Sequence, residues 1–160
     1  MAAIRDRPPG PVLRTFLRAP TLLYRAHLGW LLGNRFLCLV HRGRRSGKLR
    51  RTVVEVVHFD RRSEEAAVVA GWGPHTQWYL NLESGPPEEV RLGRRLWRAP
   101  GRRFLDEAER VALLGGYVRE HPRAAKGLGR AFGIASLDAG GIADLAGRVR
   151  AVAFRPSEKR

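Results

Sequence analysis

Residues 36–59 read FLCLVHRGRRSGKLRRTVVEVVHF, and this stretch decides the fold. The short apolar run at 36–41 is typical of a buried strand. Residues 49–59 are rich in β-branched side chains and predict a second, longer strand. The glycine-containing segment 43–47 between them predicts a turn, so the two strands are expected to pair.

The elements predicted after this pair indicate an antiparallel sheet. Further strands are expected at 66–70, 90–92, 96–104 and 149–154, with a hairpin around residues 93–95. Helices are expected at 76–82, 106–120 and 122–132, and Asp106 is the predicted N-cap of the second one. Because the strands mostly follow one another in hairpin order, they favour a sheet that closes or half-closes into a barrel over a doubly wound Rossmann fold.

Residues 1–32 predict a loose basic arm at 1–11 and a helix at 12–32 that Pro20 breaks into two pieces. The apolar face of these helices, with arginines nearby, is expected to pack on the barrel or on a second subunit, or to lie on anionic lipid. No signal peptide and no transmembrane segment is expected. We therefore expect a cytoplasmic protein, with peripheral contact at the inner face of the plasma membrane as an alternative.

The composition fits one globular domain with a basic surface. The 160 residues are 44% hydrophobic and contain one cysteine, Cys38, which excludes an intramolecular disulfide and a cysteine-rich metal site. The formal net charge is +15. Such a protein attracts polyanions, namely nucleic acid, anionic lipid or a highly charged small ligand, although a GC-rich genome would also raise the arginine content.

The densest chemical signal is the basic turn at 42–51, where six of ten residues are Arg or Lys. Glycines expose backbone N–H groups to an anion, and arginine grips phosphate or carboxylate with two donors. An ordinary solvated turn is the alternative interpretation. A P-loop is excluded because only three residues separate Gly43 from Gly47.

A second signal is the segment 70–81, AGWGPHTQWYLN, in which a strand leads through glycines into a helix. The amino end of a helix favours an anionic ligand. The alternative is that its aromatic side chains only anchor the core. The five histidines lack metal-ligand spacing and are interpreted as core or surface residues, so no metal site is expected.

These two motifs, with the WYLNL sequence at 78–82, resemble the deazaflavin-dependent nitroreductases and quinone reductases of actinobacteria from about residue 20 to residue 120. The resemblance implies an α+β fold, a mainly antiparallel split β-barrel like the FMN-binding split barrels, with N-terminal and C-terminal helices packed outside. It implies a single reductase domain at 12–156, followed by a charged tail at 157–160. The implied coenzyme is F420 in its reduced form, F420H2, which carries a phosphodiester and an oligoglutamate tail.

The resemblance also implies where the coenzyme binds. The implied coenzyme-binding residues are Arg44, Arg45, Ser46, Gly47, Lys48, Arg50, Arg51, Thr52, Val53, Val54, Glu55, Ala70, Gly71, Trp72, Gly73, Gln77, Trp78, Tyr79, Leu80 and Asn81. His75 and Tyr79 are candidate proton donors, beside solvent. Family members often carry proline where Val53 stands, and tyrosines in the C-terminal third, where this chain has none after Tyr117.

The sequence therefore predicts a reductase that transfers a hydride from F420H2 to a quinone, a nitroaromatic or an enone. A small-molecule electron acceptor is the expected partner, and a second copy of the chain is a further candidate. Two alternatives stay open at this point. One is a basic nucleic-acid-binding module that stacks bases on Trp72 and Trp78, and the other is a non-catalytic flavin- or deazaflavin-binding barrel.

Overall fold

The computed structural model describes residue 26, residue 31 and residues 33–157. The predicted arm at 1–11, most of the predicted helices at 12–32 and the membrane contact expected through them lie outside these residues. Within the described part of the chain, no helix combines the length and apolar character needed to cross a bilayer. The same residues contain no group of His, Cys, Asp or Glu side chains placed to hold a metal ion.

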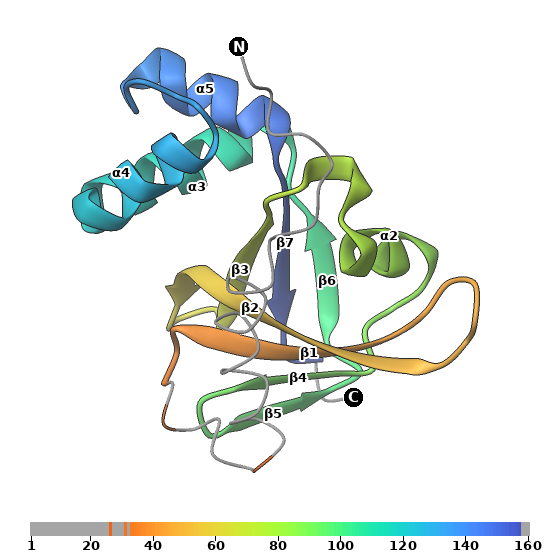
Figure 1. The fold of residues 1–160 in the computed structure, drawn as a ribbon. Helices are drawn as coiled ribbons and strands as arrows, with labels where there is room; N and C mark the ends of the chain where they lie inside the picture. The colour runs from red at the N-terminus through yellow and green to blue at the C-terminus, as the bar shows by residue number, and fades with distance from the viewer. Residues whose placement is uncertain (1–25, 27–30, 32, 158–160) are drawn as a thin grey trace.

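Seven strands of the described chain form one antiparallel sheet (Figure 1). Their order across the sheet is β5-β4-β1-β2-β3-β7-β6. The strands are β1 (Phe36–Arg42), β2 (Leu49–Asp60), β3 (Glu65–Ala70), β4 (Glu89–Leu92), β5 (Arg95–Arg98), β6 (Gly101–Phe104) and β7 (Arg150–Arg155). Every neighbouring pair is antiparallel, which confirms the predicted sheet.

The long strand β2 joins the two halves of the sheet. Its first half pairs with β1, so that Leu39 lies opposite Thr52. Its second half pairs with β3 around a β-bulge between Val56 and His58. Because a bulge bends and twists a strand locally, β2 helps to curl the sheet into the split β-barrel drawn in Figure 1. The edge strands β5 and β6 do not pair, so the barrel stays open between them.

The single strand predicted at 96–104 is wrong. The chain forms two strands there, and they lie at opposite edges of the sheet: β5 pairs with β4, whereas β6 pairs with β7. Ala99 and Pro100 separate the two. Ala99 has a φ of 43°, outside the extended region, and Pro100 has no N–H to donate to a neighbouring strand.

The alternation of side chains along β3 and β7 builds two layers of core. Ala66 and Val68 face an inner cluster with Val152 and Phe154. Ala67, between them, faces an outer cluster together with Ala151, Ala153 and Leu105. Both faces of these two strands are therefore covered, the inner one by the barrel and the outer one by helices.

Helix α2 (Gln77–Ser84) follows the short 3-10 helix η2 (Gly73–His75) and packs Trp78, Tyr79 and Leu82 into the inner cluster. The three later helices α3 (Glu107–Glu120), α4 (Pro122–Ala131) and α5 (Ala139–Arg148) lie together near the start of β7, outside the barrel (Figure 1). The Asp106 carboxylate accepts a hydrogen bond from the Glu109 N–H at 2.8 Å, which confirms the predicted N-cap.

Helix α5 was not predicted from the sequence. Gly140, Gly141 and Gly147 lower the helix propensity of this segment. Tertiary packing outweighs that cost because Leu145 and Ala146 are completely buried against α3 and its neighbours. Asp138 caps the helix by accepting a hydrogen bond from the Gly141 N–H at 3.0 Å.

Candidate functional site

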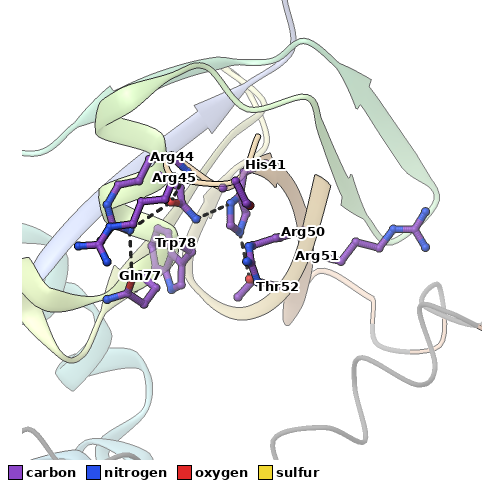
Figure 2. A pocket seen from close by; sticks show the side chains of 11 residues that line it. His41, Arg44, Arg45, Arg50, Arg51, Thr52, Gln77 and Trp78 are labelled. Atoms are coloured by element: carbon purple, nitrogen blue, oxygen red, sulfur yellow. Dashed lines mark hydrogen bonds between the residues drawn. The ribbon is translucent and has the colours of Figure 1, made fainter. Parts of the chain in front are cut away.

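A cavity of about 430 Å³ lies between the β1–β2 turn, the start of β2 and the amino end of α2. Figure 2 shows the side chains around it. The lining residues are His41, Gly43, Arg44, Arg45, Ser46, Arg50, Arg51, Thr52, Gln77, Trp78 and Asn81. The fold thus brings the basic turn and the aromatic helix, which are distant in the sequence, to the two sides of one cavity.

Two glycines allow the tight turn that forms one side of the cavity. The Gly43 N–H donates to the Lys48 carbonyl at 2.9 Å, and the Gly47 N–H donates to the Gly43 carbonyl at 2.7 Å. Gly47 has a φ of +66°, which glycine adopts without steric cost. A Cβ atom on Gly43 would lie 2.7 Å from Ser46 Oγ and 2.9 Å from Arg50 Nε. The absence of a side chain at Gly43 therefore lets Ser46 and Arg50 lie against the backbone.

Unpaired guanidinium groups give the cavity its charge. Arg44, Arg45 and Arg50 line it, and none of them pairs with a carboxylate among the residues that the structure describes. By contrast Arg42, just outside the cavity, donates to Glu88 at 2.6 Å. No Asp or Glu of the described residues lines the cavity. This positive, acid-free lining suits a ligand with several negative charges.

Arg51 lies differently from the other three arginines. Side chains alternate along a strand, so Arg51 leaves β2 on the face opposite to Arg50 and Thr52. Figure 2 shows its side chain extending away from Arg44 and Arg45. Arg51 therefore contributes to the rim of the cavity rather than to the group of cations at its centre.

A chain of hydrogen bonds connects the turn, α2, β1 and β2 beneath the cavity. The guanidinium of Arg44 donates through Nη1 to Gln77 Oε1 at 3.0 Å and to Asn81 Oδ1 at 3.3 Å. Asn81 Nδ2 lies 3.1 Å from His41 Nδ1, and His41 Nε2 lies 3.2 Å from Thr52 Oγ1. Dashed lines in Figure 2 mark the contacts of the labelled side chains. Asn81 and His41 are both buried. Burial of the imidazole lowers the pKa of His41.

The amino end of α2 meets the cavity through Gln77 and Trp78. Its N-cap residue, Thr76, is 7% exposed, and its hydroxyl makes no capping hydrogen bond. Thr76 Oγ1 has no hydrogen-bond partner among the described residues. The first turn of α2 thus keeps its backbone N–H groups free of a side-chain cap, and a helix end in this state favours an anion.

A second cavity, of about 630 Å³, opens farther along β2. It is lined by Asn34, Arg35, Glu55, Val56, Val57, His58, Phe59, Tyr117, Glu120, His121 and Ala124. The rings of Tyr117 and His121 lie 5.1 Å apart between centroids. Burial raises the pKa of the Tyr117 phenol, and the nearby charge of Glu55 raises it further. Only two residues of β2 separate Thr52 in the first cavity from Glu55 in the second.

The structure places the predicted site residues in three groups: those that line the first cavity, one that lines the second, and those that line neither. The first cavity collects Arg44, Arg45, Ser46, Arg50, Arg51, Thr52, Gln77, Trp78 and Asn81. Glu55 lines the second cavity. Neither cavity is lined by Gly47, Lys48, Val53, Val54, Ala70, Gly71, Trp72, Gly73, His75, Tyr79 or Leu80.

Sequence reasoning missed two residues that line the first cavity, Gly43 and His41. Gly43 belongs to the basic motif itself. From the sequence, His41 is interpreted as a core or surface histidine because the five histidines lack metal-ligand spacing. A signal was present, since His41 has the same strand parity as Leu37 and Leu39, which face the inner cluster.

Comparisons with known proteins identify a family through a sequence model and a shared fold through solved structures. The sequence model of the family described as F420H(2)-dependent quinone reductase matches residues 17–132. A solved structure of an F420-H2 dependent reductase, FDR-A, has a TM-score of 0.51 at 19% identity and covers 77% of this chain and 96% of that one. A structure described as a domain-swapped dimer has a TM-score of 0.52 at 19% identity and covers 86% of this chain and 100% of that one. At these identities the two structures establish the shared fold. No curated protein matched the chain.

Proposed function

Because the chain belongs to the family of F420H(2)-dependent quinone reductases, we propose that it transfers a hydride from F420H2 to a quinone. The protein is an F420-dependent oxidoreductase, and coenzyme F420 is its cofactor. The class of acceptor is the part we propose. Nitroaromatics and enones are two further acceptor classes to be compared with quinones.

The charge of the side chains that line the first cavity is complementary to the charge of this coenzyme. The phosphodiester and the oligoglutamate tail carry several negative charges, and the cavity presents three guanidinium groups without carboxylate partners in the described chain. Arginine binds such oxygens with two donors at once. This set of unpaired arginines beside α2 is the observation that carries the proposal.

When bound, the coenzyme supplies the hydride, so no side chain of the protein has to act as a nucleophile. Arg44, Arg45 and Arg50 neutralise the anionic part of the coenzyme. Thr52 and Gln77 offer polar groups to it, and Trp78 forms an apolar wall. The strand from Thr52 to Glu55 then leads from the anion-binding cavity towards the second cavity.

We place the acceptor in the second cavity. Reduction of a quinone to a hydroquinone takes one hydride and one proton, and the proton needs a donor close to the quinone oxygen. Tyr117 and His121 lie side by side in this cavity and carry suitable groups. His75 and Tyr79, the donors considered from the sequence, line neither cavity, and Tyr79 is buried in the inner cluster.

Binding is tested by titrating the purified protein with oxidised F420 and following tryptophan fluorescence, since Trp78 lines the cavity. We expect quenching at micromolar coenzyme. The oxidation of F420H2 is then followed by absorbance with quinone, nitroaromatic and enone acceptors. Absence of binding, or strongly salt-dependent binding of oligonucleotides instead, would refute the proposal.

The acceptor site is tested separately. Tyr117→Phe with His121→Gln is expected to slow quinone reduction about tenfold or more while leaving the Kd for F420 within about threefold. His75→Gln is the matched control because His75 is exposed and lines neither cavity. If His75→Gln slows the reaction and the double variant does not, His75 takes part in the proton transfer and our placement of the acceptor in the second cavity is wrong.

Two further expectations about partners stay proposals. Within the described chain, β5 and β6 are edge strands without a partner on their outer side, so their backbone groups could pair with a second copy. Light scattering on the purified protein measures whether a dimer forms. Contact with anionic lipid through residues 12–32 is tested by co-sedimentation of the full chain with anionic and with neutral vesicles.

A further inference from the structure

His41 forms part of the floor of the first cavity, near the end of β1. Its side chain is 2% exposed, and both ring nitrogens have polar neighbours. Nδ1 lies 3.1 Å from Asn81 Nδ2, and Nε2 lies 3.2 Å from Thr52 Oγ1. His41 therefore connects helix α2 to strand β2 at the place where both line the cavity.

The orientation of Asn81 decides which nitrogen of His41 carries the proton. Asn81 Oδ1 is 3.0 Å from the backbone N–H of Arg44 and 3.3 Å from Arg44 Nη1, and both of these groups can only donate. The oxygen of the amide must therefore face Arg44. The NH2 group faces His41 and donates to Nδ1, so the proton of the neutral imidazole sits on Nε2.

The same logic continues to Thr52. His41 Nε2–H donates to Thr52 Oγ1, which uses one lone pair of the hydroxyl. The hydroxyl keeps its own proton, and within the described chain Oγ1 has no other hydrogen-bond partner to accept it. Thr52 lines the cavity. The free proton of the hydroxyl is therefore available to a ligand oxygen there.

Accordingly we infer that His41 is a positioning residue for coenzyme binding: through Thr52 it presents a hydrogen-bond donor to an oxygen of the coenzyme, and through Asn81 it holds Arg44 in place. The inference rests on the proposed function of the cavity, and it assigns a role to a buried residue of the cavity floor. His41 acts through its neighbours and does not touch the reacting atoms.

The surroundings of His41 disfavour the charged form of its imidazole. Burial lowers the pKa of the imidazole, the nearby charge of Arg50 lowers it further, and a backbone hydrogen bond at Arg42 acts in the opposite direction. Arg50 is also the residue opposite His41 in the β1–β2 pair. A second proton, on Nδ1, would point at the NH2 group of Asn81. Donor would then face donor, and the link to Arg44 would be lost.

A double-mutant cycle on coenzyme affinity tests the link between His41 and Thr52. Thr52→Val removes the hydroxyl at constant shape and is expected to weaken F420 binding about tenfold. His41→Asn keeps an acceptor oxygen towards Asn81 but loses the donor to Thr52, and we expect binding to weaken at least about threefold. The double variant should bind about as weakly as Thr52→Val alone, because His41 acts through that hydroxyl.

A rescue variant distinguishes a positioning role of the His41 hydrogen bonds from a role in packing alone. His41→Gln places an amide N–H near the position of Nε2, and we expect its Kd for F420 to stay within about threefold of the wild type. Multiplicative losses in the cycle, or equal losses for His41→Gln and His41→Asn, would overturn the inference. If the wild type itself does not bind F420, both the inference and the proposed function fail, whereas binding with independent losses rejects the inference alone.

The tautomer of the His41 ring can be measured in the wild-type protein, so this test does not depend on a variant folding correctly. In the full chain with ¹⁵N-labelled histidine, long-range ¹H–¹⁵N correlation spectra distinguish Nε2-protonated from Nδ1-protonated rings. One of the five histidines should remain neutral and Nε2-protonated below pH 6.5, where exposed histidines become cationic. A His41 signal with the proton on Nδ1, or one that titrates like an exposed histidine, would overturn the assignment.

Discussion

The side-chain oxygen of Asn81, on helix α2, accepts a hydrogen bond from the backbone N–H of Arg44, in the β1–β2 turn, at 3.0 Å. The same oxygen lies 3.3 Å from the guanidinium of Arg44. One amide group therefore fixes both the backbone and the side chain of a residue 37 positions away. This contact and the hydrogen bond from Arg44 Nη1 to Gln77 Oε1 at 3.0 Å hold the turn against the helix, and the cavity lies between the two.

Replacement of Asn81 by alanine should destabilise the protein. The change leaves the buried His41 Nδ1 and the part-buried Arg44 N–H without their partner, so we expect the free energy of unfolding to fall by about 1–3 kcal/mol. Urea denaturation measures this. Ser84→Ala, at the exposed end of the same helix, is the control and should change stability by less than about 0.5 kcal/mol. Equal effects of the two substitutions would mean that the contact with Arg44 adds nothing.

Removal of two cavity arginines should affect binding more than stability. Arg44→Ala with Arg45→Ala takes away two donors to the anionic coenzyme, and we expect the Kd for F420 to rise about 100-fold. The matched control, Arg61→Ala with Arg62→Ala, removes the same charge from the exposed β2–β3 turn and should change Kd less than about threefold. Similar losses in both variants would show that only the net charge of the protein matters.

Stability should fall as the pH decreases below 6.5, because of His41. Burial holds the pKa of the folded imidazole below its ordinary value of 6.5. As the pH falls through 6.5, the unfolded chain takes up a proton that the folded protein does not, so the free energy of unfolding decreases until the folded pKa is passed. His41→Gln should remove this slope between about pH 5 and 7.5 in urea denaturation.

The carboxylates with lowered pKa act in a separate range. Hydrogen bonds from the Arg62 N–H to Asp60 and from the Gly141 N–H to Asp138 lower the pKa of these groups from 3.8. Their contribution is present above that value and is lost as the pH falls through the lower folded pKa. An unchanged slope above pH 5 in His41→Gln would therefore contradict the assignment to His41.

Thr76→Val should not weaken the fold, although Thr76 is the N-cap of α2. Its hydroxyl makes no capping bond, and Oγ1 is buried without a hydrogen-bond partner in the described chain. Valine has nearly the same shape and no polar atom to bury, so the free energy of unfolding should stay equal or rise by about 1 kcal/mol. Thermal and urea unfolding measure the change. A loss of more than about 1 kcal/mol would mean that the hydroxyl has a partner in solution.

Strong local patterns predicted most of the fold. The apolar run of β1, the β-branched residues of β2 and the capping residue of α3 each belong to one segment and were predicted correctly. The failures came from segments that depend on distant partners. Residues 96–104 divide because β6 finds its partner in β7, more than forty positions later, and α5 forms on buried contacts despite three glycines.

The candidate site shows the same division. The basic turn was evident from residues 42–51, because six cations in ten positions are local information. The role of His41 was not evident, because strand parity indicates the face of β1 on which it lies but not the residues that meet it there. Only the pairing of β1 with β2 and the packing of α2 place Thr52 and Asn81 on its two nitrogens.

By itself, then, the sequence determined the composition of this protein's site: a glycine-containing turn rich in arginine, a long β-branched strand and an aromatic helix. These features follow from the backbone preferences of single residues, from the spacing of apolar residues and from local charge, all of which act within a few residues. The tertiary structure alone decided which of those arginines point inward, which histidine lies beneath them and where the sheet opens. Such outcomes depend on burial and on hydrogen bonds between residues that meet only when the chain is folded.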